Sequence, residues 1–262
     1  MEDPTARFAE LVEGPEDQLP LDRAALLIAG HAYPDLDVDA HLAWLDDLAA
    51  RCPEPTFEGW RRYLFEDLRF SGDVEDYYDP ANSFLNEVLR RRTGLPITLS
   101  VVGMEVGRRL GLPFVGVSMP GHFLIEHLGS GPRRWVDAFA AGRVLDRAAC
   151  EERFHLVNGA STPFLESYLD PVGPRLILGR MLANLKAIYA SRGNLEALAW
   201  VFALRLAIPG TPPLERRELA RVLGSTGQFV QAAQALEELA DTLPTQATSL
   251  LAEAQALRAR LN

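Results

Sequence analysis

The chain has 262 residues, of which 48% are hydrophobic, and a formal net charge of −10 at pH 7. Its length and apolar content allow one large or two medium domains with a full buried core. The acidic balance argues against nucleic acids and anionic membranes as partners, because both bind through a basic surface that meets phosphate.

The first twenty residues are acidic and polar, without the basic and then apolar pattern of a secretory signal. No uninterrupted apolar run approaches the roughly 20 residues that a membrane span requires. We therefore expect a cytoplasmic protein in which residues 1–20 are loosely ordered. The two cysteines, Cys52 and Cys150, have neither the spacing of a metal site nor that of a disulfide framework, so we expect no metal and no cofactor.

Helical periodicity and turn signals predict that helices fill the chain from residue 21 to residue 110. These helices are expected at 21–30, 38–50, 57–70, 84–92 and 97–110. The last of them carries Gly103 and Gly107, one turn apart. Each glycine costs a helix about 1 kcal/mol relative to alanine, so the pair indicates a close approach of another element to this helix. We expect this helix to be buried.

From Phe114 the pattern changes to that of strands, which are joined by turns rich in glycine and proline. The predicted strands cover 114–118, 122–127, 133–139 and 142–146. Helices followed by a run of short strands predict an α+β fold, in which an antiparallel sheet covers the helix with the two glycines. This domain is expected to span residues 21–160.

Residues 161–262 are predicted to be helical and to contain a repeat. Gly193 and Gly227 lie 34 residues apart, and each is followed two positions later by an apolar residue, Leu195 or Phe229. A helix-turn-helix unit of 34 residues with a terminal proline is typical of tetratricopeptide repeats. We therefore expect an all-α, tetratricopeptide-like region after the first domain.

Two polar residues in the predicted strands form a candidate site. His122 begins an apolar strand, and Asp137 follows fifteen residues later, so adjacent strands would bring them together. A histidine that donates one ring hydrogen to a carboxylate has a fixed tautomer and acts as a general base in triads of the papain type. Spacing alone favours the alternative, a buried histidine that is hydrogen-bonded for structural reasons.

Several blocks in the same order resemble the bacterial SirB family of transglutaminase-like proteins with tetratricopeptide-type C-termini. The blocks are YDPANSFLNEVL (78–89), RRTGLPITLS (91–100), PGHFL (120–124) and RMLANLKAIY (180–189). The resemblance spans about residues 20–260. It implies a transglutaminase/papain-like core, in which a central helix carries a nucleophilic cysteine at its N-terminus and packs on a sheet that supplies His and then Asp. His122 and Asp137 match those two positions.

The expected position of the nucleophile holds no cysteine. A helix N-terminus favours a thiolate through its dipole and its free N–H groups, but here the residues at 95–98 are LPIT. Thr98 and Ser100 offer hydroxyls there, although an unactivated hydroxyl is a far weaker nucleophile, and capping or packing is the alternative role. For Cys52 and Cys150 we expect the role of small buried apolar residues.

Two functions follow from these residues. The first is a catalytically inactive, transglutaminase-like scaffold or regulatory protein that binds a protein or peptide partner through its helical repeats or its cleft. The second is an amidase, protease or acyl transferase in which His122 is the base, Asp137 orients it, and the nucleophile is not cysteine. An open cleft above Thr98 and His122 would favour the enzyme, and a cleft filled by side chains would favour the scaffold.

Overall fold

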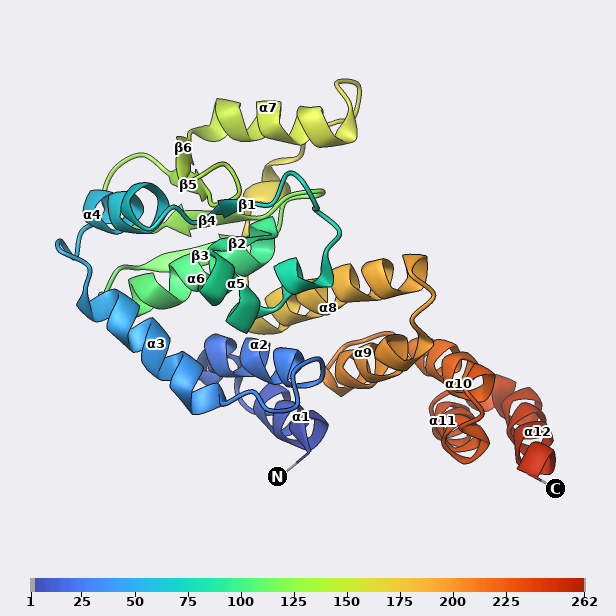
Figure 1. Cartoon of the computed structure of the whole chain (residues 1–262). Coiled ribbons are helices and arrows are strands. Elements are labelled where there is room, and N and C mark those ends of the chain that lie inside the picture. The colour runs from blue at the N-terminus through green and yellow to red at the C-terminus, as the bar shows by residue number, and fades with distance from the viewer. Residues whose placement is uncertain (1–2, 262) are drawn as a thin grey trace. The chain divides into compact units, whose positions relative to one another are not determined.

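Figure 1 presents the computed structural model, which describes residues 3–261. Contacts within the chain divide it into two compact units. The first, which we call the sheet unit, is Glu16–Met181, and the second, the helical unit, combines Met1–Pro15 with Leu182–Asn262. The first domain therefore extends beyond the predicted boundary at residue 160, because Pro171–Val172 pairs with the sheet.

The helices of the sheet unit agree largely with the predicted pattern. They are α2 (Leu21–Gly30), α3 (Val38–Ala50), α4 (Phe57–Arg61), α5 (Leu85–Arg91), α6 (Pro96–Arg109) and α7 (Arg147–Asn158). Side-chain caps define several starts: Asp37 accepts from Ala40 N before α3, and Asp146 accepts from Ala149 N before α7.

The helix predicted over 57–70 is interrupted. After α4 the chain continues as a π-helix over Arg62–Asp67, in which Leu68 N donates to Tyr63 O. Tyr63, Leu64 and Phe65 are all buried. The π turn contains one residue more than an α turn, so the regular helical period predicted over 57–70 is not kept.

The sheet has five strands in the order β6-β5-β4-β3-β7, and all its neighbours are antiparallel. The strands are β3 (Phe114–Val117), β4 (Leu124–His127), β5 (Arg134–Asp137), β6 (Arg143–Leu145) and β7 (Pro171–Val172). A separate parallel pair joins β1 (Ser71–Gly72) to β2 (Thr93–Gly94). The α+β class and the four predicted strands are confirmed.

Helix α6 packs on the sheet through its glycines, and Figure 1 shows it running beside β3 and β4. A Cβ at Gly103 would lie 2.7 Å from Ile125 Cδ1, and one at Gly107 would lie 2.2 Å from the Phe114 ring. Trp60 Nε1 also donates to Gly103 O at 3.0 Å. The close approach predicted from the two glycines is therefore confirmed.

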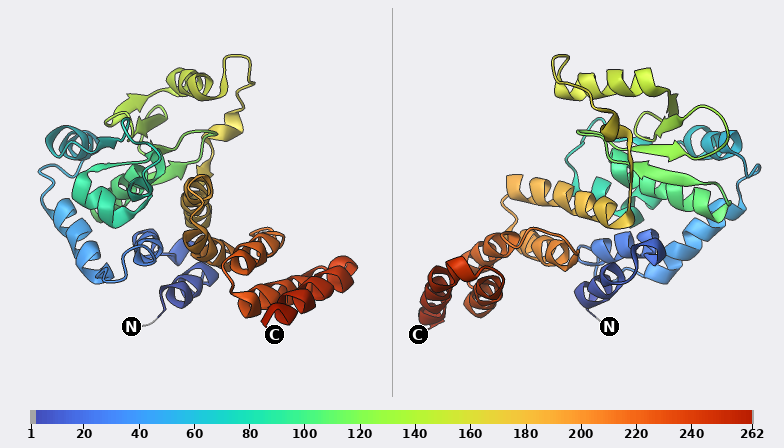
Figure 2. Two further views of the ribbon diagram at one scale, coloured as in Figure 1. Left: turned by 45° about the vertical axis from the view of Figure 1, so that its right-hand side comes forward. Right: turned by 180° about the vertical axis from the view of Figure 1, so that it is seen from behind.

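The helical unit contains α1 (Pro4–Glu13), α9 (Leu195–Ala207), α10 (Glu215–Ser225), α11 (Phe229–Thr242) and α12 (Ala247–Arg258). Helix α8 (Pro174–Ser191) begins in the sheet unit and ends in this one. Gly193 and Gly227 occupy the turns before α9 and α11 with φ of 65° and 79°, a conformation that glycine adopts without strain. Successive helices from α9 to α12 pack against one another (Figure 2).

The expectation of a loosely ordered N-terminus is wrong for residues 4–13, which form α1. Asp3 caps this helix through Thr5 N, and Phe8 and Val12 are fully buried. These two buried apolar residues, four positions apart, anchor the segment, and α1 packs against α9. The first two residues of the predicted loose segment lie outside the described ones.

Within residues 3–261, no helix is long and apolar enough to cross a membrane.

Candidate functional site

His122 lies in the turn between β3 and β4. Its backbone N–H donates to Met119 O at 3.0 Å, which closes the turn. Arg180 of α8 holds the same turn, since its Nη1 donates to Ser118 Oγ at 2.6 Å and to Met119 O at 2.9 Å. The position of the imidazole therefore depends on a contact with a helix that lies about sixty residues further along the chain.

Asp137 is the last residue of β5, and its carboxylate organises the following turn. Asp137 Oδ1 accepts from Ala140 N at 3.0 Å, while the backbone carbonyl of Asp137 accepts from Gly142 N at 3.0 Å. Short polar side chains commonly stabilise turns through such local bonds. Asp137 thus has a structural role that needs no catalysis.

The structure brings His122 and Asp137 together. Nε2 of His122 lies 2.9 Å from Oδ1 of Asp137, and their side chains are only 3% and 2% exposed. This is hydrogen-bond distance, although the N–H direction departs from that of a well-aligned bond. With the proton on Nε2, the lone pair remains on Nδ1, which is the nitrogen that would accept a proton from a nucleophile. A catalytic role of the pair stays a prediction.

Arg153, on the unpredicted helix α7, completes the charges at this site. Its Nε lies 3.3 Å from Asp137 Oδ2. Burial acts to raise the pKa of Asp137, but the contacts with His122, Arg153 and the N–H of Ala140 outweigh burial and leave this pKa below its ordinary value. Asp137 therefore stays ionised at neutral pH.

This lowered pKa predicts a difference in acid sensitivity. An aspartate whose pKa falls on folding stabilises the protein above its unfolded value of about 3.9, and the contribution is lost as pH falls through the lower folded pKa. Between pH 6 and pH 2.5, wild type should therefore lose more unfolding free energy in urea titrations than Asp137→Asn does. Asp241→Asn, at an exposed position, is the control. An equal acid dependence of wild type and Asp137→Asn would contradict the prediction.

Thr98 is the third residue of α6 and does not act as a cap, because the N-cap is Leu95 and makes no side-chain hydrogen bond. Its side chain is fully buried, and Oγ1 has no hydrogen-bond partner within the described residues. Thr98 is therefore not hydrogen-bonded to His122. The second hydroxyl, that of Ser100, donates to Pro96 O at 2.7 Å, one turn back in the same helix.

The first turn of α6 nevertheless lies level with the turn that holds His122. Gly103 faces Ile125, and Gly107 faces Phe114, which pairs with His127 across the sheet. Four helical residues advance about 6 Å and two strand residues about 7 Å, so α6 and β4 run alongside each other in the same direction. Continuing toward both N-termini leads to the start of α6 and to the turn before β4. This is the position at which the family resemblance implies a nucleophilic cysteine.

Aromatic side chains cover the histidine. The ring centroids of His122 and Phe139 are 6.3 Å apart, and Phe139 packs in turn against Tyr77 at 5.8 Å. The Phe139 ring occupies the space that a Cβ at Gly72 would need, at 2.3 Å. His122 and Thr98 are themselves both buried.

Neither cysteine is a candidate thiolate. Cys150 lies in the buried apolar cluster with Trp135 and Phe154, and burial raises the pKa of its thiol to about 12. Cys52 Sγ donates to Glu54 O at 3.3 Å, and burial raises its pKa as well. Both thiols are protonated at neutral pH. Across residues 3–261, no three His, Cys, Asp or Glu side chains gather where they could hold a metal ion.

Sequence reasoning missed several residues at the site. No sequence pattern indicated that Arg153 lies at the site, because the helix that carries it was not predicted. A sequence pattern did point to Arg180, because this residue begins the block RMLANLKAIY that contributes to the family resemblance. Phe139 lay inside a predicted strand, but its position over His122 depends on the turn after β5.

Comparisons with known proteins identify relatives of the chain. A family model described as the transglutaminase-like superfamily matches residues 35–183. A UPF0162 protein of Xylella fastidiosa (strain 9a5c) is 39% identical over 198 residues, which cover 70% of each chain. A UPF0162 protein of Vibrio cholerae is 33% identical over 132 residues, or 50% of this chain and 48% of the relative. Human F-box only protein 21 is 31% identical over 138 residues, which are 50% of this chain but 21% of that protein. No solved structure gives a significant match.

Proposed function

Because this chain belongs to the transglutaminase-like superfamily, we propose that it uses the superfamily's fold as a catalytically inactive scaffold that binds a protein or peptide partner. One observation carries the proposal. The start of α6 offers no thiol, and the Oγ1 of Thr98 is buried without a hydrogen-bond partner among the described residues. A hydroxyl is a weak nucleophile unless it is activated, most often by a base within hydrogen-bond reach that removes its proton.

Structure alone accounts for the retained pair. Removing Asp137 would leave His122 and Arg153 without their buried carboxylate and Ala140 N without its acceptor. An orphaned buried polar group costs about 1–3 kcal/mol. Retention of the pair is therefore expected in a protein that no longer uses it for chemistry.

Within the superfamily, we propose that the chain is of the SirB type and that its helical unit is tetratricopeptide-like. The 34-residue spacing of Gly193 and Gly227 and the consecutive packing of α9 to α12 support this assignment. In such arrays, successive helices create extended surfaces that bind peptide segments. We assign partner binding to these helices, since His122 and Thr98 are both buried and present little surface to a partner.

A labelling experiment tests the absence of chemistry. Wild type is incubated with a fluorophosphonate, which reacts with activated hydroxyls, and separately with iodoacetamide, and the mass of the intact protein is measured. We expect no stoichiometric adduct of the native protein with either reagent. A one-to-one fluorophosphonate adduct that disappears in Thr98→Ala and in His122→Ala would overturn the scaffold proposal.

The idle hydroxyl of Thr98 predicts the effect of a near-isosteric substitution. Replacing a buried, unpaired hydroxyl with a methyl group removes its desolvation cost, so Thr98→Val should raise the free energy of unfolding by about 1 kcal/mol or leave it unchanged. Urea unfolding measures the effect. Ser100→Ala is the control, because Ser100 does have an acceptor, and it should be neutral or destabilising. A loss above 1 kcal/mol in Thr98→Val would mean that the hydroxyl has a partner.

The second candidate function is an amidase, protease or acyl transferase with a non-cysteine nucleophile. The 2.9 Å contact between His122 and the ionised Asp137 favours it, because this carboxylate would stabilise the imidazolium formed during catalysis. Incubating partner proteins with wild type and with a His122→Ala, Asp137→Asn double variant separates the two functions. Cleavage or crosslinking by wild type alone would establish the enzyme.

A further inference from the structure

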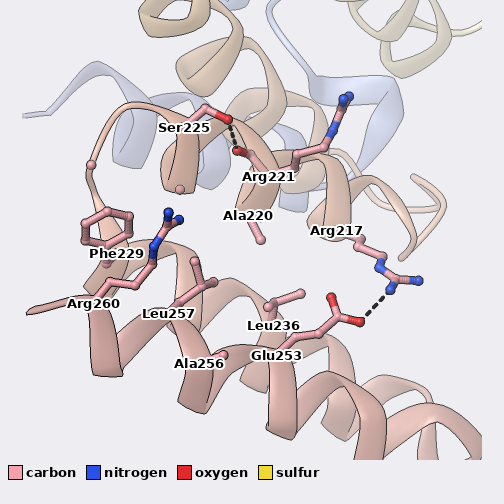
Figure 3. A pocket seen from close by; sticks show the side chains of 12 residues that line it. Arg217, Ala220, Arg221, Ser225, Phe229, Leu236, Glu253, Ala256, Leu257 and Arg260 are labelled. Atoms are coloured by element: carbon pink, nitrogen blue, oxygen red, sulfur yellow. Dashed lines mark hydrogen bonds and ion pairs between the residues drawn. The ribbon is translucent and has the colours of Figure 1, made fainter.

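The helical unit contains a groove of about 1140 Å³ between α10, α11 and α12 (Figure 3). All of its lining residues belong to this unit. Pockets for small ligands typically measure about 300–1,000 Å³, so the groove is large for a single small molecule and has room for several peptide side chains. Its floor is apolar and includes Ala220, Leu236 and Leu257.

The charge of the groove is opposite to that of the protein. Its lining includes three arginines, Arg217, Arg221 and Arg260, but a single acidic residue, Glu253. The whole chain, by contrast, carries a net charge of −10. Arg221 is paired with Glu218, one turn earlier on α10. The excess positive charge therefore comes from Arg217 and Arg260 against Glu253. Such an excess on an acidic protein favours a segment that brings carboxylates.

Two of the arginines stand at opposite ends of the groove in Figure 3. At one end, the guanidinium of Arg260 lies over the Phe229 ring, 5.1 Å from its centroid. This contact orients the guanidinium without neutralising its charge. Arg260 forms no ion pair with a described residue, so its donors remain available to a bound carboxylate.

At the other end, Arg217 Nη2 lies 2.5 Å from Glu253 Oε1. Both side chains are nearly half exposed, at 49% and 41%. Such surface pairs contribute little to stability because water screens them. Arg217 can therefore exchange Glu253 for a carboxylate of a ligand at small cost.

We propose that this groove binds an acidic peptide segment of another protein, in which Leu or Phe side chains enter the apolar floor and flanking Asp or Glu side chains meet Arg217 and Arg260. The inference rests on the proposed function, since it names the class of partner that the scaffold binds. The groove does not include His122 or Asp137, so peptide binding by the groove and the proposed lack of catalysis at this pair are tested separately.

The test begins with selection of a displayed library of random 12-residue peptides on the immobilised full-length protein. Enriched peptides are expected to combine Leu or Phe with neighbouring Asp or Glu. Their dissociation constants are then measured by fluorescence polarisation at 50 and 300 mM NaCl, and binding should weaken at the higher salt concentration.

Matched variants locate the binding site. Arg217→Gln with Arg260→Gln should weaken binding at least tenfold. The control, Arg216→Gln with Arg258→Gln, makes the same change of charge at neighbouring residues that do not line the groove and that pair with Glu238 and Glu237. It should change binding less than twofold.

A second pair of variants tests shape instead of charge. Ala256 lines the groove, whereas Gln255 is exposed and does not. Ala256→Trp should block binding, and Gln255→Trp should not. Circular dichroism of all variants verifies that they fold.

The proposal fails if selection yields no binders, if it enriches basic or uncharged peptides, or if the groove variants bind as well as their controls. A His122→Ala, Asp137→Asn double variant should bind the selected peptides like wild type. If catalysis is found while the groove variants still lose peptide binding, the scaffold proposal is wrong and the proposal for the groove is retained. If no catalysis is found and the groove variants bind the peptides normally, the proposal for the groove is wrong and the scaffold proposal is retained.

Discussion

Replacing Arg109 with Met is expected to lower the free energy of unfolding by about 3–5 kcal/mol, the usual cost of removing one partner from a buried ion pair. Arg109 lies near the end of α6 and is only 12% exposed. Its Nη2 is 2.7 Å from Asp22 Oδ2, its Nη1 is 2.8 Å from Glu105 Oε2, and its Nε is 2.6 Å from Asp46 Oδ1. One guanidinium thus joins α2, α3 and α6.

The two buried carboxylates explain why the loss is large. Burial is the strongest single effect and acts to raise the pKa of Asp22, but the hydrogen bonds from Arg109 and from the N–H of Arg23, together with the charge of Arg109, outweigh it and leave this pKa below its ordinary value. Burial and the neighbouring Asp22 charge raise the pKa of Glu105. Without Arg109, two buried acidic groups would face each other with only the exposed Arg108 nearby. In the variant, the pKa values of Asp22 and Glu105 in the folded protein would then lie above their unfolded values. The loss of unfolding free energy should therefore become smaller as pH falls toward about 4.

Urea unfolding at pH 7 and pH 5 measures this prediction. The control is Arg108→Met, at the adjacent residue, which is 62% exposed although it approaches the same carboxylates. It should cost less than about 1 kcal/mol, because exposed pairs contribute little. Equal losses in the two variants would show that burial of Arg109 is not what makes it important.

Replacing Trp60 with Ala is expected to cost a similar 3–5 kcal/mol, the usual range for a buried tryptophan. Trp60 is fully buried in α4. Its ring lies 4.3 Å from the Phe114 centroid and 5.6 Å from that of Phe65, and its Nε1 bonds the backbone of Gly103. The substitution leaves a cavity between α4, α6 and β3 and removes the donor to a helical carbonyl.

Thermal and urea unfolding of Trp60→Ala and Trp60→Phe test this account. The phenylalanine variant keeps much of the packing but loses the hydrogen bond, so it should lie between wild type and Trp60→Ala. Trp44→Ala, at an exposed tryptophan on α3, should cost less than about 1 kcal/mol. If Trp44→Ala were as damaging as Trp60→Ala, cavity formation would not be the cause.

Local sequence patterns predicted the structure correctly where one residue type determines it. Helix α3 begins and ends where predicted, because Asp37 caps it and an apolar stripe continues to its end. The two glycines of α6 predicted its close contact with the sheet, since glycine destabilises a helix and its presence there indicates close packing. His122 and Asp137 could be paired in advance, because neighbouring antiparallel strands bring their ends together.

Other features depend on contacts that no local pattern contains. Helix α7 buries only Cys150 and Phe154, which is too little for a visible stripe. Arg153 therefore could not be assigned to Asp137 from the sequence. Strand β7 has two residues and begins with proline, so only its pairing with β3 defines it. The boundary between the units was misplaced for the same reason.

The two edges of the sheet limit how a partner can bind. At one edge, β7 is only Pro171–Val172, and proline has no N–H to offer to another strand. At the other, β6 has three residues and begins with the exposed Arg143. Short edges that carry proline or charge are poor templates for strand addition. An incoming peptide therefore gains little by extending this sheet, and the same edges protect the protein from β-type aggregation at high concentration.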